Sequence, residues 1–216
     1  MARHPGLLID NCASGGRRLD LEMIARSFSL HPSDTYGWPD LGAATVFVQN
    51  LTNSLSRWYP AFLARAFDNS AYRLRSGLGA GMGVSCAAPA VEDHQTLPLG
   101  VIRQHTQEEL DVRQFFYGDF YSLAGPSLNR TDWVAWQFDR PDLGQGIVQA
   151  FRREDNEQET ASFKLHGLDP TARYAVTDAD SGQATQAKGR ELMEQGLPVR
   201  AAQRPAALLL RYDKIS

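Results

Sequence analysis

The sequence predicts an α/β segment followed by an antiparallel β-sandwich, and three observations support this prediction. Short apolar runs alternate with longer amphipathic runs from residue 7 to about residue 123, a pattern typical of parallel α/β units. After Pro126 the runs become short, strand-like and separated by turns. The chain has 216 residues and is 43% hydrophobic, which is enough to bury a sizeable core as one or two domains.

The first half is expected to contain strands and helices in alternation. Residues 7–9 predict a strand, residues 21–26 the helix that follows it, and residues 28–30 a second strand. Apolar positions across residues 43–58 predict a helix that ends before Pro60. Further along, the chain predicts a short strand after a glycine-rich stretch and then another helix, over residues 84–86 and 99–116.

The second half is expected to be an antiparallel β-sandwich. Its strand-like runs cover residues 133–138, 146–151, 161–165, 173–177 and 207–212. Turn-forming pairs such as Pro141-Asp and Ser181-Gly lie between them. We place the boundary between Leu123 and Arg130, which predicts domains at residues 1–125 and 130–216.

Composition excludes several classes of partner. The net charge of −3 and the pI of about 5.9 argue against a nucleic-acid partner. No apolar run reaches the roughly 18 residues of a membrane span, and residues 1–9 lack the long apolar core of a signal peptide. The only cysteines are Cys12 and Cys86, too few for a disulfide framework, so we expect a cytoplasmic protein.

The stretch Asn11-Cys-Ala-Ser-Gly-Gly-Arg17 follows the first predicted strand and is the first candidate site. Its glycines allow a ligand to approach the backbone, and Ser14 and Arg17 are donors. A phosphate site is one interpretation, although the P-loop frame is missing. A purely structural turn is another. Cys12 has no base beside it in the sequence, which argues against covalent thiol chemistry.

The second candidate site is Ser33-Asp34, which follows the second predicted strand. A lone aspartate at a strand end is most often a turn former or a helix cap. Neighbouring βα loops lie at the same end of a parallel sheet. We therefore expect Asp34 and the Cys12 loop to face one common opening at the C-terminal ends of adjacent strands. His31 and Asp34 are both potential metal ligands, but no third ligand lies at a recognisable spacing, so neither a metal nor a cofactor is predicted.

These motifs resemble glycoside hydrolase family 36, the α-galactosidases often called melibiases. The resemblance starts with the residue 11–17 stretch, Asp20 and Ser33-Asp34, and it continues downstream through nearly the whole chain. The downstream phrases are FYGDFY at 116–121, AWQFDRPD at 135–142, GLDPTARY at 167–174 and GRELM at 189–193. The resemblance implies a (β/α)8 barrel followed by a C-terminal β-sandwich, with this chain covering barrel strands five to eight and the sandwich.

The resemblance also implies roles for individual residues. Asp34 matches the general acid/base of a retaining mechanism, which needs two carboxyl groups about 5–5.5 Å apart. The loop that lines the sugar pocket matches Asn11, Cys12, Ser14, Gly15 and Arg17. The implied substrate is an α-galactoside or a related sugar.

This chain departs from the family pattern in two ways. The family nucleophile is an aspartate in a Lys-x-Asp motif on the fourth barrel strand, and no such motif occurs here. His31 stands where many relatives have tryptophan. We therefore expect a fragment with little activity alone.

Half a barrel also leaves parallel strands with open edges. These edges are expected to pair with a missing N-terminal half or with another copy of the chain. Two alternatives stay open: a non-catalytic carbohydrate-binding or assembly module derived from such an enzyme, and an unrelated α/β anion-binding protein.

Overall fold

The computed structural model describes residues 4–12, 17–27, 29–34, 40–66, 70–84 and 99–215. The chain divides into two compact units, Met1–Gln104 and His105–Ser216. The division falls inside helix α4 (Leu99–Val112), whereas the change of sequence pattern predicted a boundary between Leu123 and Arg130. The domains proposed at residues 1–125 and 130–216 stay a prediction.

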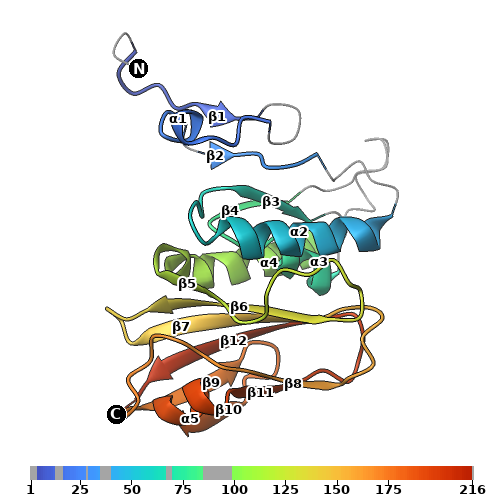
Figure 1. The fold of residues 1–216 in the computed structure, drawn as a ribbon, viewed down its shortest axis with the longest axis vertical. Coiled ribbons are helices and arrows are strands. Elements are labelled where there is room, and N and C mark those ends of the chain that lie inside the picture. The colour runs from blue at the N-terminus through green and yellow to red at the C-terminus, as the bar shows by residue number, and fades with distance from the viewer. Residues whose placement is uncertain are drawn as a thin grey trace. The chain divides into compact units, whose positions relative to one another are not determined.

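The first unit alternates short strands with helices along the chain (Figure 1). In order, its described elements are β1 (Asp10–Asn11), α1 (Leu21–Ile24), β2 (Ser29–Leu30), α2 (Leu41–Leu55), β3 (Leu63–Ala66), α3 (Ala71–Ser76), β4 (Gly81–Val84) and the start of α4.

All strand pairs in this unit are parallel among the described residues. β1 pairs with β2, and β3 pairs with β4. A parallel bridge between Leu30 and Phe62 connects the two pairs, and the backbone N–H of Leu30 donates to the Ala61 carbonyl at 3.2 Å. The four strands therefore follow one another in space in the same order as in the sequence.

Helix α2 covers this parallel array through its apolar side. The Asp40 side chain accepts a hydrogen bond from the Ala43 N–H at 3.0 Å, which caps the helix N-terminus. Val48 and Leu55 then pack with Leu30 and Phe62 in one buried cluster. Burial of this apolar area holds the helix against β2 and the residue preceding β3.

The first predicted strand lies three residues later than expected. Residues 7–9 are not in a strand, and the side chains of Leu7 and Leu8 are 52% and 75% exposed. Asp10 and Asn11 form β1 instead, because they are the residues that lie opposite Ser29 and Leu30. The prediction of residues 7–9 as a strand was wrong: an apolar triplet alone does not decide which backbone groups have a partner.

The second unit is built mostly from antiparallel strands, as predicted. It contains the 3₁₀ helix η3 (Arg113–Tyr117), β5 (Asp119–Ser122), β6 (Trp133–Arg140), β7 (Gln145–Arg152), β8 (Thr160–Phe163), β9 (Arg173–Asp178), β10 (Ala184–Lys188), α5 (Gly189–Glu194), β11 (Leu197–Arg200) and β12 (Ala206–Lys214).

Its described strands form two antiparallel sheets. The larger has the order β10-β9-β12-β7-β6-β5, and the smaller pairs β11 with β8. One hydrophobic cluster contains Val148 and Leu210 from the large sheet together with Phe163 and Val199 from the small one. The two sheets thus share a core, as in a sandwich.

Candidate functional site

Two neighbouring parallel strands place the predicted site residues at the same end. Asn11 lies opposite Leu30 in the β1–β2 pair, and the backbone N–H of His31 donates to the Asn11 carbonyl at 2.8 Å. Cys12 therefore leaves β1 where His31 leaves β2. The carboxyl ends of adjacent parallel strands are where α/β proteins gather their functional side chains.

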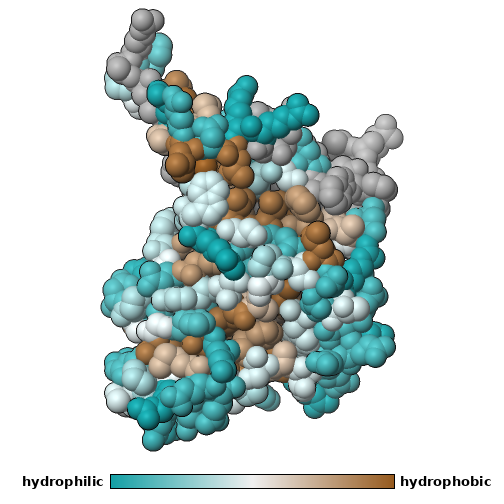
Figure 2. All heavy atoms as spheres, viewed as in Figure 1, coloured by the Kyte–Doolittle hydropathy of each residue, from teal (hydrophilic) through white to brown (hydrophobic). Residues whose placement is uncertain are grey.

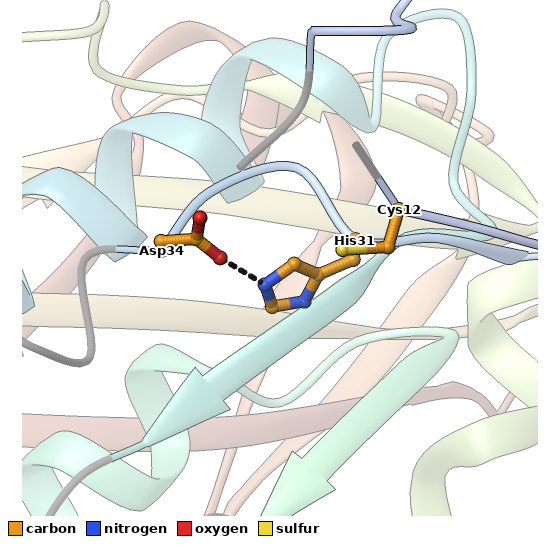
Figure 3. Close-up of side chains that lie close together, drawn as sticks. All are labelled: Cys12, His31 and Asp34. Carbon is orange, nitrogen blue, oxygen red and sulfur yellow. Dashed lines mark hydrogen bonds and ion pairs between the residues drawn. The ribbon is translucent and has the colours of Figure 1, made fainter. Parts of the chain in front are cut away.

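Three side chains with different chemistry meet at this end. The thiol of Cys12, the imidazole of His31 and the carboxylate of Asp34 each contribute one atom to a group within 4.8 Å. A hydrogen bond of 3.0 Å joins His31 Nε2 to Asp34 Oδ1 (Figure 3). His31 is only 5% exposed, whereas Cys12 and Asp34 are exposed. The buried imidazole thus bonds one residue that a ligand in solvent can reach, Asp34, and lies near another, Cys12.

The remaining predicted site residues are less closely involved. Asn11 is 2% exposed, and its Nδ2 donates to the Arg18 carbonyl at 3.1 Å, so it joins the strand end to the far side of the loop. The Arg17 side chain is exposed, and among the described residues no hydrogen bond or ion pair links it to the cluster. Ser14 and Gly15 lie outside the described residues.

The expected convergence of Cys12 and Asp34 is present, but sequence reasoning did not identify Cys12 as a potential metal ligand beside His31 and Asp34. The i,i+3 spacing of His31 and Asp34 was visible in the sequence. Cys12 lies 19 residues before His31 and reaches it only through the β1–β2 register. A tertiary contact of this kind carries no short-range sequence signal, so the third potential metal ligand was not predicted.

A second polar cluster lies buried in the large sheet of the second unit. The Tyr212 hydroxyl donates to Asp139 Oδ1 at 2.5 Å, and Gln137 Nε2 donates to the Tyr212 oxygen at 2.7 Å. Burial raises the pKa of Asp139, and burial followed by the contact with Asp139 raises the pKa of Tyr212. Gln137 also bonds both backbone groups of His166. Apart from Asp139 Oδ2, these groups bond one another inside the sheet, which is typical of a structural network.

The second unit also has an open polar groove of about 720 Å³. Carboxylates from Asp132, Asp155 and Glu157 line it. Trp133 lies beside them but is 9% exposed, and its Nε1 donates to the Gln158 carbonyl at 2.8 Å. Its ring is therefore buried and not presented for stacking on a sugar. No described helix combines the length and apolar character needed to cross a membrane.

Comparison with known protein families finds a match within the second unit. Residues 133–211 match the glycosyl hydrolase family 36 C-terminal domain. No curated protein sequence matches the chain significantly.

Several solved structures have a similar fold over almost the whole chain. The galactosidase domain of the α-galactosidase-sucrose kinase AgaSK has a TM-score of 0.74 at 23% identity, covering 99% of this chain and 30% of that one. The family 36 α-galactosidase AgaA of Geobacillus stearothermophilus, in complex with raffinose, has a TM-score of 0.75 at 21% identity, covering 99% of this chain and 30% of that one. The α-galactosidase of Lactobacillus brevis has a TM-score of 0.74 at 22% identity, covering 100% of this chain and 30% of that one. This chain thus spans about 30% of the length of these enzymes.

Proposed function

We propose, from the match of residues 133–211 to the glycosyl hydrolase family 36 C-terminal domain, that the whole chain is the C-terminal portion of a retaining α-galactosidase. Residues 1–125 then supply strands five to eight of a (β/α)8 barrel. The parallel pairs β1–β2 and β3–β4, joined through Leu30 and Phe62 and separated by helices, support this assignment. The substrate class is an α-galactoside, the class that includes the raffinose bound by AgaA.

Asp34 acts in this proposal as the general acid/base. Its carboxyl group protonates the leaving oxygen and then removes a proton from the attacking water. The observation that carries the assignment is the convergence of Asp34 with Cys12 at the ends of adjacent parallel strands. An exposed carboxylate at this position reaches a bound sugar, and its neighbours on β1 supply the polar wall of the pocket.

His31 positions the Asp34 carboxylate. Its imidazole is buried and is hydrogen-bonded to Asp34 Oδ1. This bond restricts the rotation of an otherwise exposed side chain. A carboxylate that is already held in place loses less conformational entropy when the substrate binds beside it. In this proposal His31 is thus a positioning residue, which orients the acid/base through one hydrogen bond.

The nucleophile belongs to a part of the enzyme that this chain does not contain. Within the described residues, β1 and β4 each pair with a strand on one edge only. Exposed apolar side chains gather around β1 and α1 (Figure 2). They include Leu7, Leu8, Leu19 and Leu21, with exposures between 38% and 77%. Open strand edges and uncovered leucines are what a barrel half exposes when its other half is absent.

Turnover of p-nitrophenyl α-galactoside tests the proposal. We expect negligible activity from the chain alone. Activity is expected when an N-terminal half carrying the Lys-x-Asp motif is added, supplied by the upstream reading frame or by AgaA. Asp34→Asn is expected to lower the activity of the complete pairing, whereas Asp111→Asn, which changes an exposed aspartate of α4, leaves it unchanged.

Robust turnover by the isolated chain, lost in Asp34→Asn, would show that the nucleophile lies on this chain. Binding of galactose by the chain, with no hydrolysis in any pairing, would favour the alternative of a non-catalytic carbohydrate-binding module.

A further inference from the structure

Cys12, His31 and Asp34 offer the three kinds of ligand atom that zinc prefers in proteins. A thiolate sulfur, an imidazole nitrogen and a carboxylate oxygen are each common zinc ligands. Sulfur and imidazole ligands select against Mg²⁺ and Ca²⁺, which take oxygen ligands almost exclusively. The three potential ligand atoms lie within 4.8 Å of one another, and their residues come from two adjacent strand ends (Figure 3).

The separations suit a tetrahedral ion after a small adjustment. Bonds of about 2.0–2.3 Å to zinc place tetrahedral ligand atoms about 3.5 Å apart. His31 Nε2 and Asp34 Oδ1 are now 3.0 Å apart, so an ion between them lengthens this pair slightly. The wider pairs, at up to 4.8 Å, contract by roughly 1 Å. Cys12 and Asp34 are the exposed members, and their side chains are free to make this movement without disturbing buried packing.

The backbone fixes the ligand that moves least. His31 is 5% exposed and its N–H is bonded to the Asn11 carbonyl at 2.8 Å. The buried imidazole of His31 therefore gives an ion one fixed ligand. The exposed side chains of Cys12 and Asp34 can move to complete the site and leave it accessible from solvent.

We propose that Cys12, His31 and Asp34 bind one Zn²⁺ ion, with water or an exogenous ligand in the fourth position. Binding breaks the His31–Asp34 hydrogen bond and replaces it with two metal bonds. The proton that His31 Nε2 donates to Asp34 moves to Nδ1 of the same imidazole, and the thiol proton of Cys12 is released to solvent. The proposal goes beyond the α-galactosidase assignment and does not depend on it. Where both hold, the ion occupies the Asp34 carboxylate and so opposes its role in proton transfer.

Cobalt titration of the reduced, metal-free chain tests this site without any sugar or partner. Co²⁺ bound to a thiolate gives a sulfur-to-metal charge-transfer absorption, and we expect this band to saturate at one ion per chain. Added Zn²⁺ should remove it, because zinc binds more tightly to such sites than cobalt. Cys12→Ser should abolish the band. Asp34→Asn should weaken binding by at least about tenfold, the low end of what even outer-shell changes cost a metal site.

Cys86→Ser is the matched control, because it removes the only other cysteine of the sequence; the band should persist in it. Cys12 and Asp34 are exposed, so their variants are expected to fold, which far-ultraviolet circular dichroism checks. The proposal is overturned if the band is missing in the unaltered chain, survives Cys12→Ser, is unaffected by Asp34→Asn, or disappears in Cys86→Ser. None of these outcomes bears on turnover by the completed enzyme, so the two proposals fail separately.

Discussion

Asp139 lies in β6 with 2% of its surface exposed, and its pKa is raised because burial disfavours the charged carboxylate. The hydrogen bond from Tyr212 opposes this effect but does not cancel it. No described residue donates a hydrogen bond to the second carboxylate oxygen. The site is therefore better suited to a neutral carboxylic acid than to a carboxylate.

Asp139→Asn tests this interpretation through the pH dependence of stability. A raised pKa means that the folded chain holds a proton that the unfolded chain, with a pKa of about 3.9, gives up more readily. The stabilisation by Asp139 is thus complete at pH values below its pKa in the unfolded chain, and it is lost as the pH rises through its pKa in the folded chain. Denaturant unfolding followed by tryptophan fluorescence should show the native chain losing stability relative to Asp139→Asn across this window.

Asp169 provides a control of the opposite sign. Hydrogen bonds from Thr171 and then Lys214 lower its pKa, so its contribution is present at neutral pH and is lost on acidification. The effect is expected to be small because this ion pair is exposed. A native chain that keeps or gains stability relative to Asp139→Asn as pH rises would contradict the account of Asp139.

At the scale of elements, two buried arginines hold the loops at one end of the sandwich. Arg153 is fully buried, and its Nη1 donates to the carbonyls of Ser127 and Asn129 at 2.7 Å each. Arg152 bonds the carbonyls of Ala201 and Asn156 in the same way. The end of β7 thus fixes the segment that leads into β6.

Replacing Arg153 by methionine removes both bonds from the segment before β6. Bonds from a charged donor contribute about 1.5–3 kcal/mol each, and carbonyls left unpaired add to the cost. We expect a loss of about 3 kcal/mol in the free energy of unfolding, measured by denaturant titration. Arg200→Met is the control: its pair with Glu159 is exposed, and its loss should cost about 1 kcal/mol or less. Equal losses from the two variants would show that burial of Arg153 is not what matters.

Elements whose side chains alternate or form apolar runs were predictable, and those that depend on partners were not. β6, β7, β8, β9 and β12 overlap the five runs expected after residue 133. β10 was missed because its side chains are mostly exposed and small or polar, so nothing in its pattern indicates a sheet; backbone pairing with β9 makes it a strand. β3 and α3 were missed because alanine and arginine make up most of β3 and half of α3, so neither has a clear apolar pattern.

The candidate site follows the same division. The positions of Cys12 and Asp34 at strand ends were inferable from the motifs, because apolar runs precede both. The contact of His31 with Asp34 is local, three residues apart in the sequence, whereas the approach of Cys12 to His31 depends on the β1–β2 register, which no local pattern encodes. His31 was considered as a metal ligand and noted as a departure from the family, but its burial within the cluster was not predicted.

At the scale of the whole molecule, the chain is about 30% of the length of the α-galactosidases it is similar to. Within the part of the chain that the structure describes, β1 and β4 each pair along one edge only, and the leucines around β1 and α1 are exposed. The acid/base is present in the proposed assignment and the nucleophile is not. Activity is therefore expected to be a property of the completed barrel and not of either half.

The most direct test of the central claim compares two substrates in the completed enzyme. A general acid matters most when the leaving group is poor, because such a group must be protonated as it departs. In the pairing with an N-terminal half, we expect Asp34→Asn to reduce kcat/KM for raffinose by a far larger factor than for p-nitrophenyl α-galactoside, whose leaving group departs readily. Equal reductions for the two substrates, or no reduction at all, would contradict the assignment of Asp34 as the acid/base.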